Sequence, residues 1–459
     1  MPARVTPIAK SLAAPVYGRR TPPPFVDQML FRYDDESPVY SDFGGTQLQK
    51  VDGGNVKAIR STGTIPILAP LIYNSTAATY QAKTYGGRQS VKFNGSAFSF
   101  GVKSQLEQVV NNSVNWALFF LLKINATGTN QILWQNTSHT QCQVVTSTSQ
   151  VMMGGFTSGV LPSDYSTNPH TYGFIMQNEW GSGSDGARLC VAGAPVGTTA
   201  IPTNTSNAAE WVLGGLLTGA FRGYDLHADV LAAIILSRQL KPHEFCQLSD
   251  HYYARFGLTN PRAAATKVVV WQTNSIAVLN QSPQLPELVR ANLGYPIGSS
   301  FHLGQTSKSW PTMNNEGPEY TDPLLKYLKN SPIGPGDPVY VQWEGVNNTT
   351  PSTGYTDLDN RVAAGGVRKA RCIMANVIAK SSAAFPTWAA TQSAENSDIA
   401  ANYATHAGYE AIPASDAVLG YGGTPNGMGD TTYSPDGTHL TQAGANVAVP
   451  YFATAIGAV

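Results

Sequence analysis

Charge of either sign, cysteine and long apolar runs are all scarce in this 459-residue sequence. Only 13% of the residues are charged, and 29 basic side chains balance 29 acidic ones. A chain without net charge creates no field that would attract nucleic acid or an anionic membrane. No stretch approaches the roughly 18 apolar residues of a membrane-spanning helix. We therefore expect neither nucleic acid nor a membrane among its partners.

Cysteine is nearly absent, with four residues at Cys142, Cys190, Cys246 and Cys372. They form no C-x-x-C pair, and no histidines cluster beside them. This argues against a disulfide framework and a structural zinc site, and leaves open a single disulfide in the first part of the chain. We expect no bound metal.

Residues 1–25 form a basic, proline-containing leader that lacks the continuous apolar core of a secretory signal peptide. Two interpretations remain open. The leader is either a flexible segment or an extended arm that docks on a larger assembly.

Residues 26–258 alternate short apolar runs with Gly, Asn and Ser. Many short strands separated by turn signals predict an antiparallel β-sandwich of the jelly-roll kind. Pro242 begins a closing helix that ends at Gly257. The clearest predicted strands are 90–93, 116–124, 131–134, 151–153, 171–176, 188–191, 211–213 and 230–236.

Three features of this region carry a resemblance: Q-S-V-K-F-N-G-S at 89–96, W-A-L-F-F-L-L-K-I at 116–124, and the final helix ending in R-F-G-L. Together they resemble the laminin-G-like, concanavalin A-like lectin domains. The resemblance implies loops that bind sugar or calcium, although no ligand residue can be carried over. Trp180 and Tyr165 are candidates for stacking on a sugar, but an aromatic residue in a sandwich more often belongs to the core.

A short linker at 259–266 precedes a change of pattern, because strands and helices alternate over residues 267–459. Such alternation predicts a three-layer α/β/α domain with a parallel sheet. In these sheets the chemistry lies beyond the carboxyl ends of the strands. The expected strands are 267–271, 299–303, 338–343, 372–378 and 409–412, and the expected helices are 286–293, 322–328, 358–364, one within 394–406 and one from 443 onward.

Polar residues follow the first three of these strands. Ser275 comes after the first strand, Gly304 after the second and Asn347 after the third. Asp436 and His439 lie three residues apart in the turn S-P-D-G-T-H before the last helix.

Acyl transfer through a serine requires a nucleophile, a base, a group that orients the base, and donors for the developing oxyanion. We expect Ser275 to attack, His439 to accept its proton and Asp436 to hold the imidazole. The backbone N–H groups of Ser275 and Gly304 and the side-chain amide of Asn347 would form the oxyanion hole. Glycine at position 304 allows close approach of the backbone to a substrate.

This order and spacing resemble the SGNH (GDSL-type) hydrolase superfamily. The blocks G-Q-T-S-K-S-W at 304–310 and D-G-T-H-L-T-Q-A-G-A at 436–445 look most like rhamnogalacturonan acetylesterases, and E-G-V-N-N at 344–348 fits the same family. The resemblance covers about residues 267–459. It implies an ester hydrolase that needs no metal or organic cofactor.

The first block departs from the family, because Thr273-Asn274-Ser275 stands where the family has Gly-Asp-Ser. Losing the glycine should restrict the turn, and losing the acid should remove a group that orders the loops. A second register would make Thr273 the nucleophile, although a β-branched secondary alcohol is the poorer one.

Each site residue also has a structural interpretation: Ser275 as a helix cap, Gly304 and Asn347 as turn formers, and His439 as a surface residue. Four of them in four loops, in family order, favour catalysis. His302, His406 and Asp416 are interpreted as structural.

These observations predict a carbohydrate O-acetylesterase whose lectin-like domain holds an acetylated polysaccharide. The combination suggests an extracellular or virion-associated protein, such as a phage fibre or spike, with the arm at 1–25 binding other virion proteins and a second copy of the chain as a further candidate partner. The alternative is a non-catalytic virion decoration or adhesion protein with a degenerate SGNH domain, which the altered first block favours.

Overall fold

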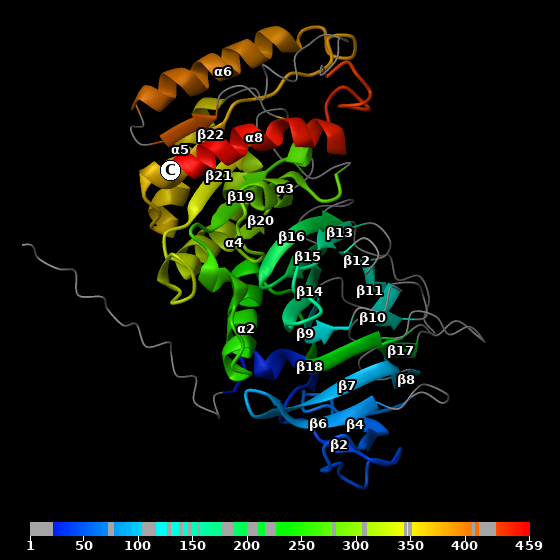
Figure 1. Ribbon diagram of the computed structural model, residues 1–459. Coiled ribbons are helices and arrows are strands. Elements are labelled where there is room, and N and C mark those ends of the chain that lie inside the picture. The colour runs from blue at the N-terminus through cyan, green and yellow to red at the C-terminus, as the bar shows by residue number, and fades with distance from the viewer. Residues whose placement is uncertain are drawn as a thin grey trace, which may run out of the picture.

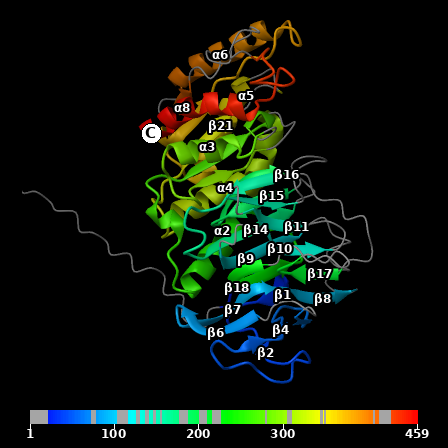
Figure 2. The ribbon, with the colours of Figure 1, turned by 45° about the vertical axis from the view of Figure 1, so that its right-hand side comes forward.

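A computed structural model of the chain describes residues 22–71, 78–102, 116–125, 130–136, 141–145, 149–153, 157–176, 187–199, 210–215, 226–277, 281–304, 310–343, 347, 351–405, 409–412 and 428–459. The antiparallel sheets of the first part and the parallel sheet of the second are stacked along one long axis (Figures 1 and 2).

The largest sheet has nine strands around the long central strand β18 (Leu226–Leu236), whose first half pairs with β7 and whose second half pairs with β1. All its pairings are antiparallel. Its other strands are β16 (Ala194–Thr199), β15 (Ala187–Val191), β14 (His170–Met176), β9 (Ala117–Ile124), β7 (Arg88–Ser96), β6 (Ala78–Tyr85), β3 (Asn55–Val56) and β1 (Met29–Tyr33).

A six-stranded and a three-stranded antiparallel sheet complete the first part. The six strands are, in spatial order, β13 (Thr157–Val160), β12 (Gln150–Met153), β11 (Gln141–Val145), β10 (Asn130–Asn136), β17 (Glu210–Leu213) and β8 (Phe98–Val102). The three strands are β2 (Val39–Tyr40), β4 (Ala58–Arg60) and β5 (Leu68–Pro70). The predicted strands are thus found in antiparallel sheets, while the jelly-roll topology stays a prediction.

Strand β9 explains why the run at 117–124 is apolar without alternation. Leu118 and Phe120 belong to a core that also contains Leu133 and Val144 of the six-stranded sheet. On the other face Phe119 packs on α2 (Pro242–Arg255), with its ring 5.5 Å from that of Phe245. A strand covered on both faces needs apolar residues at every position.

The segment at 259–266, predicted as a linker, contains a short helix and three buried residues, Asn260, Arg262 and Ala265. Asn260 caps the 3-10 helix η3 (Pro261–Ala264), and the fully buried Arg262 pairs with Asp250 of α2 at 2.5 Å. Tyr327, from the second part of the chain, donates to the same carboxylate at 2.7 Å. Breaking a buried ion pair of this kind costs about 3–5 kcal/mol, so this connection is a rigid joint.

The second part is built on a five-stranded parallel sheet, as predicted from the alternation of strands and helices. Its spatial order is β20 (Ser300–His302), β19 (Val269–Thr273), β21 (Val339–Trp343), β22 (Cys372–Ala375) and β23 (Tyr409–Ile412). Its α-helices are α3 (Leu285–Asn292), α4 (Trp310–Asn330), α5 (Pro351–Gly365), α6 (Trp388–Thr405) and α8 (Gln442–Ala458). The remaining 3-10 helices are η1 (Val26–Gln28), η4 (Ser275–Ala277) and η5 (Lys369–Arg371).

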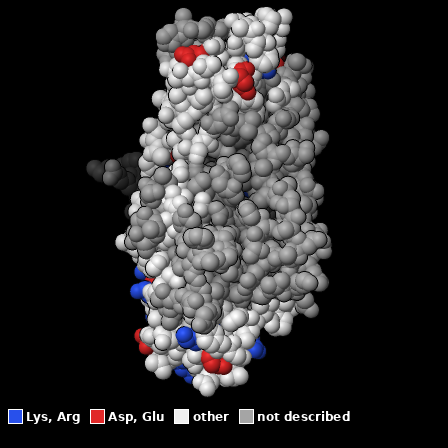
Figure 3. Space-filling view, turned by 90° about the vertical axis from the view of Figure 1, so that its right-hand side faces the viewer, with Lys and Arg blue, Asp and Glu red and all other residues white. Residues whose placement is uncertain are grey.

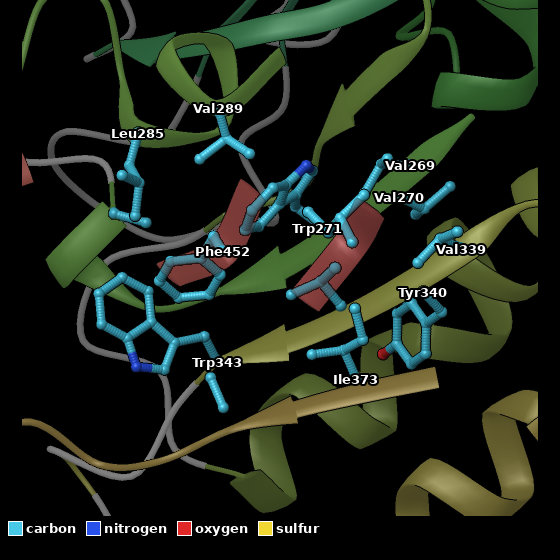
Figure 4. Packing of buried hydrophobic residues seen from close by; sticks show 14 of the residues in the cluster. Val269, Val270, Trp271, Leu285, Val289, Val339, Tyr340, Trp343, Ile373 and Phe452 are labelled. Carbon is cyan, nitrogen blue, oxygen red and sulfur yellow. The ribbon is translucent and has the colours of Figure 1, made fainter. Parts of the chain in front are cut away.

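Two neighbouring residues of β19 show that helices cover both faces of this sheet. Trp271 packs on Phe452 of α8, which also contacts Trp343 of β21 at 4.8 Å between ring centroids (Figure 4). Gln272 accepts a hydrogen bond from Thr321 of α4 at 3.3 Å. Because successive side chains of a strand point to opposite faces, α8 and α4 lie on opposite sides of the sheet.

Two predicted boundaries are wrong for identifiable reasons. Helix α4 begins at Trp310 rather than at 322 and continues through Pro318 and Pro323, where it packs along α5 and α2. Strand β22 ends at Ala375 rather than at 378, because the backbone of Val377 bonds the Asn396 side chain of α6 through both its N–H and its carbonyl oxygen.

All four cysteines are buried free thiols, so the single disulfide left open by the sequence is not formed. Among the residues described, none of the helices combines the length and the apolar character that crossing a bilayer requires. On the face shown in Figure 3, the charged side chains of the described residues gather toward the two ends of the molecule.

Replacing Phe452 with alanine should lower the free energy of unfolding by about 3–5 kcal/mol, because the ring fills the space between two fully buried tryptophans. Denaturant titration measures the change. The control is Phe43→Ala, since that ring is 51% exposed and its loss should cost no more than about 1 kcal/mol. Equal losses in both variants would contradict this assignment of the core.

Glu395 of α6 should make stability depend on pH. Burial raises the pKa of Glu395 to about 8, against a partial offset from Lys380. A carboxyl whose folded pKa exceeds its unfolded value loses stability as pH rises from the unfolded pKa toward the folded one. Glu395→Gln removes this loss. The Tm of the variant minus the Tm of the wild type should therefore increase as pH rises from about 5 to about 9. A constant difference in calorimetry across this range would contradict the prediction.

Candidate active site

The candidate site lies at the carboxyl edge of the parallel sheet, where the strand order reverses. Strand β19 is flanked by β20 on one side and by β21 on the other, so the chain crosses in opposite directions from it. Open parallel sheets bind ligands beyond such a switch point. Ser275 follows β19 at this position.

The Ser275 loop is ordered by its own backbone and by Asn274. The buried Asn274 accepts the Ile276 N–H through its side-chain oxygen at 3.1 Å, and its backbone N–H donates to the Trp343 carbonyl at 3.3 Å. Asn274 therefore orders this loop where the family has an acid, because an amide oxygen accepts as a carboxylate does. Thr273 is still part of β19, where the backbone is extended and glycine is not required.

The turn that carries Asp436 and His439 is built around the Asp436 carboxylate. One of its oxygens accepts the N–H groups of Thr438 at 2.9 Å and His439 at 2.8 Å. Gly437 adopts φ 75°, and a Cβ there would lie 2.5 Å from the Cβ of Ser381. Only glycine fits this position, both for its φ and for its close approach to the loop after β22.

The structure brings the three predicted catalytic side chains into one hydrogen-bonded chain. His439 Nδ1 lies 2.5 Å from Asp436 Oδ2, and His439 Nε2 lies 3.0 Å from Ser275 Oγ. Ser275 is 4% exposed, whereas the side chains of His439 and Asp436 are 23% and 49% exposed. The hydroxyl thus lies at the base of the site and the carboxylate at its rim.

Asp436 is held in its ionised form. Partial burial works to raise the pKa of Asp436, but the hydrogen bonds from His439 and Thr438 outweigh it and bring that pKa below its usual value. An ionised carboxylate on Nδ1 fixes the tautomer in which Nε2 is free to accept the proton of Ser275. The arrangement therefore has the parts of a general-base-activated nucleophile.

The alternative nucleophile, Thr273, does not take part in this chain. Its side chain is fully buried, and its hydroxyl has no hydrogen-bond partner among the described residues. The geometry favours Ser275.

The predicted oxyanion donors also follow strands at this edge. Gly304 comes directly after Leu303, whose N–H donates to the Trp271 carbonyl of β19 at 2.8 Å. Asn347 lies in an exposed turn beyond β21. The residues beside it, 344–346 and 348–350, lie outside the described ranges, so its role as a donor stays a prediction.

The residues interpreted as structural divide into two groups. His302 is 1% exposed at the end of β20, and Tyr165 is half-buried against the core of the first part. His406, Asp416 and Trp180 lie outside the described residues, as do residues 1–21 of the N-terminal leader.

Two residues near the site were missed in the sequence. Ser381 donates its N–H to the Gly437 carbonyl at 2.8 Å and supports the Asp436 turn. Arg188 of β15 donates to the carbonyl oxygens of His302 and Gly304, each at 3.1 Å. The signal for Arg188 was present, because a charged residue interrupts the apolar run A-R-L-C-V-A at 187–192.

Comparisons with known proteins give weak similarity. No family model and no curated protein matches the chain. Among solved structures, the lipase/acylhydrolase from Enterococcus faecalis is similar at 18% identity over 42% of this chain and 96% of that one, with a TM-score of 0.33. A GDSL-like lipase from Bacteroides thetaiotaomicron is 15% identical over 45% of this chain and 97% of that one, with a TM-score of 0.30. Trypanosoma rangeli sialidase is 11% identical over 43% of this chain and 31% of that one, also with a TM-score of 0.30. Similarity at this level does not assign the chain to a family.

A fluorophosphonate probe should label Ser275 covalently, because the hydroxyl is activated by His439. Peptide mass spectrometry locates the adduct. His439→Ala should abolish labelling, whereas Ser434→Ala, at a serine whose hydroxyl has no partner among the described residues, should leave it intact. Labelling of Thr273 in the wild type would reverse the choice of nucleophile.

Proposed function

We propose that this chain is a serine esterase of the SGNH type that removes O-acetyl groups from a polysaccharide. The observation that carries the proposal is the hydrogen-bonded chain Asp436–His439–Ser275, with 3.0 Å between the imidazole and the hydroxyl. This distance lies within the range required of a general base and its nucleophile.

In the acylation step, Ser275 Oγ attacks the carbonyl carbon of the ester while His439 Nε2 takes the hydroxyl proton. Asp436 stabilises the resulting imidazolium. The negative charge on the carbonyl oxygen is met by the N–H groups of Ser275 and Gly304 and by the Asn347 amide. The tetrahedral intermediate then breaks its bond to the sugar oxygen, which receives the proton from His439 and leaves as a hydroxyl group, with the acetyl group on Ser275.

In the deacylation step, water replaces the sugar. His439 removes a proton from the water as it attacks the acyl-serine. The second tetrahedral intermediate then breaks its bond to Ser275 Oγ, which receives that proton from His439, and acetic acid leaves and ionises to acetate. The proposed chemistry uses side chains and backbone N–H groups of this chain, together with water, and requires no cofactor.

Two features support an uncharged polymeric substrate. The acid and base lie at an open rim, with the Asp436 side chain 49% exposed, so a long chain can lie across the site. The sequence has a balanced and low charge, which suits polar ligands without ionic groups.

The antiparallel sheets of the first part are proposed to hold the glycan as a lectin-like module. Binding a polymer beside the site raises the local concentration of its ester groups. A phage fibre or spike that acts on a bacterial surface would combine these properties, with residues 1–25 docking on other virion proteins and assembly with further copies of the chain.

The alternative is a virion decoration or adhesion protein that no longer hydrolyses esters. The departure at Thr273-Asn274-Ser275 is the feature that favours it. The hydrogen bond by which Asn274 orders the Ser275 loop supports the esterase over this alternative.

Wild type should hydrolyse p-nitrophenyl acetate and release acetate from an acetylated glycan. Ser275→Ala should reduce both activities to background, because it removes the attacking oxygen. Thr273→Val is the matched control, since it deletes a buried hydroxyl without a partner among the described residues and should retain activity. No turnover by the wild type would favour the non-catalytic alternative.

Asp436→Asn should lower kcat by about 10²–10⁴-fold with little change in KM, because a neutral amide neither fixes the imidazole tautomer nor stabilises the imidazolium. Steady-state kinetics on p-nitrophenyl acetate measures both constants. Asp430→Asn provides the control, since Asp430 accepts from Thr432 in the same loop. An unchanged kcat in Asp436→Asn would remove this carboxylate from the mechanism.

A further inference from the structure

A guanidinium from the antiparallel part of the chain reaches the loop of the parallel sheet that carries Gly304. Arg188 lies on β15, one strand in from the edge strand β16, and β16 packs against β20. Arg188 is fully buried, and its Nη1 and Nη2 donate to the carbonyl oxygens of His302 and Gly304, each at 3.1 Å.

These two bonds hold the peptide groups that precede and follow the Leu303–Gly304 peptide. The peptide between His302 and Leu303 is held at its oxygen by Arg188 and at its nitrogen by the Trp271 carbonyl, at 2.8 Å. The peptide that follows Gly304 is held at its oxygen by Arg188. Between them lies the Leu303–Gly304 peptide, whose N–H is the proposed oxyanion donor. With both neighbours fixed, this peptide has little freedom to rotate.

We infer that Arg188 is a positioning residue for the oxyanion hole, which aims the Gly304 N–H at the developing oxyanion by clamping the carbonyls on both sides of it. The inference rests on the proposed esterase function. It means that the antiparallel part of the chain contributes to the chemical step as well as to substrate binding.

The planar fork of arginine suits this task. Its two terminal nitrogens reach two acceptors at once, whereas a lysine ammonium is a point charge that rotates freely. The neighbouring imidazole is compatible with the guanidinium, because burial and then the charge of Arg188 lower the pKa of His302 to about 3 and keep that ring neutral.

The test uses full-length Arg188→Lys, which keeps the buried charge but loses the fork. A misaligned oxyanion donor should lower kcat on p-nitrophenyl acetate by about 10–100-fold. KM and the shape of the pH–rate profile should not change, because Ser275, His439 and Asp436 are untouched. Hydrogen exchange of peptides spanning 299–310 should be faster than in the wild type.

The matched control is Arg32→Lys, at another buried arginine, which pairs with Asp34 and Glu36 in the antiparallel part of the chain. This variant should lose thermal stability while kcat and exchange of the 299–310 segment stay at wild-type values. If kcat falls in both variants, and falls in each in proportion to its loss of Tm, then Arg188 has a purely structural role and the inference is overturned.

The remaining outcomes separate the inference from the proposed function. Wild-type kcat in Arg188→Lys overturns the positioning role and leaves the esterase intact. If the wild type shows no Ser275-dependent turnover, the proposed esterase function is wrong. Hydrogen exchange of the 299–310 segment then decides by itself whether Arg188 fixes the loop. Exchange equal to that of the wild type overturns the inference in that case too.

Discussion

The hydrogen bond between Ser275 and His439 joins two segments that are 164 residues apart, and the chemistry of the site depends on keeping that distance at 3.0 Å. Ser275 is placed by β19, the strand at the switch point of the sheet. His439 is placed by the Asp436 turn, which rests on the loop after β22 through Ser381. Phe452 anchors the following helix, α8, on the tryptophans of β19 and β21. Packing across the sheet therefore sets the geometry of the candidate site.

The two parts of the chain are joined by more than a covalent connection. Ala194 and Cys246 of the first part belong to the hydrophobic core of the parallel sheet. The buried Arg262–Asp250 pair, with Tyr327, fixes the segment between the parts. These buried contacts hold the antiparallel and the parallel parts of the chain against each other.

The strands, the helices and the parallel sheet were predictable because each has a local pattern in the sequence. The three side chains of the hydrogen-bonded chain were also predictable, since two of them share a single turn and the third follows the first strand. Contacts over long separations were not. No local sequence pattern indicates that the Asn396 side chain binds the backbone of Val377 and ends β22, or that α4 continues through Pro318. Arg188 was visible as an unusual charge in an apolar strand, but its partners, more than 110 residues away, were not.

The shared turn of Asp436 and His439 has a consequence for how such a site is lost or transplanted. Asp436 and His439 form one local unit, held together by hydrogen bonds within four residues. Insertions elsewhere in the chain cannot separate them, and a displacement of the turn carries both away from Ser275 together. The position of this one turn against the end of β19 therefore decides whether both groups reach Ser275.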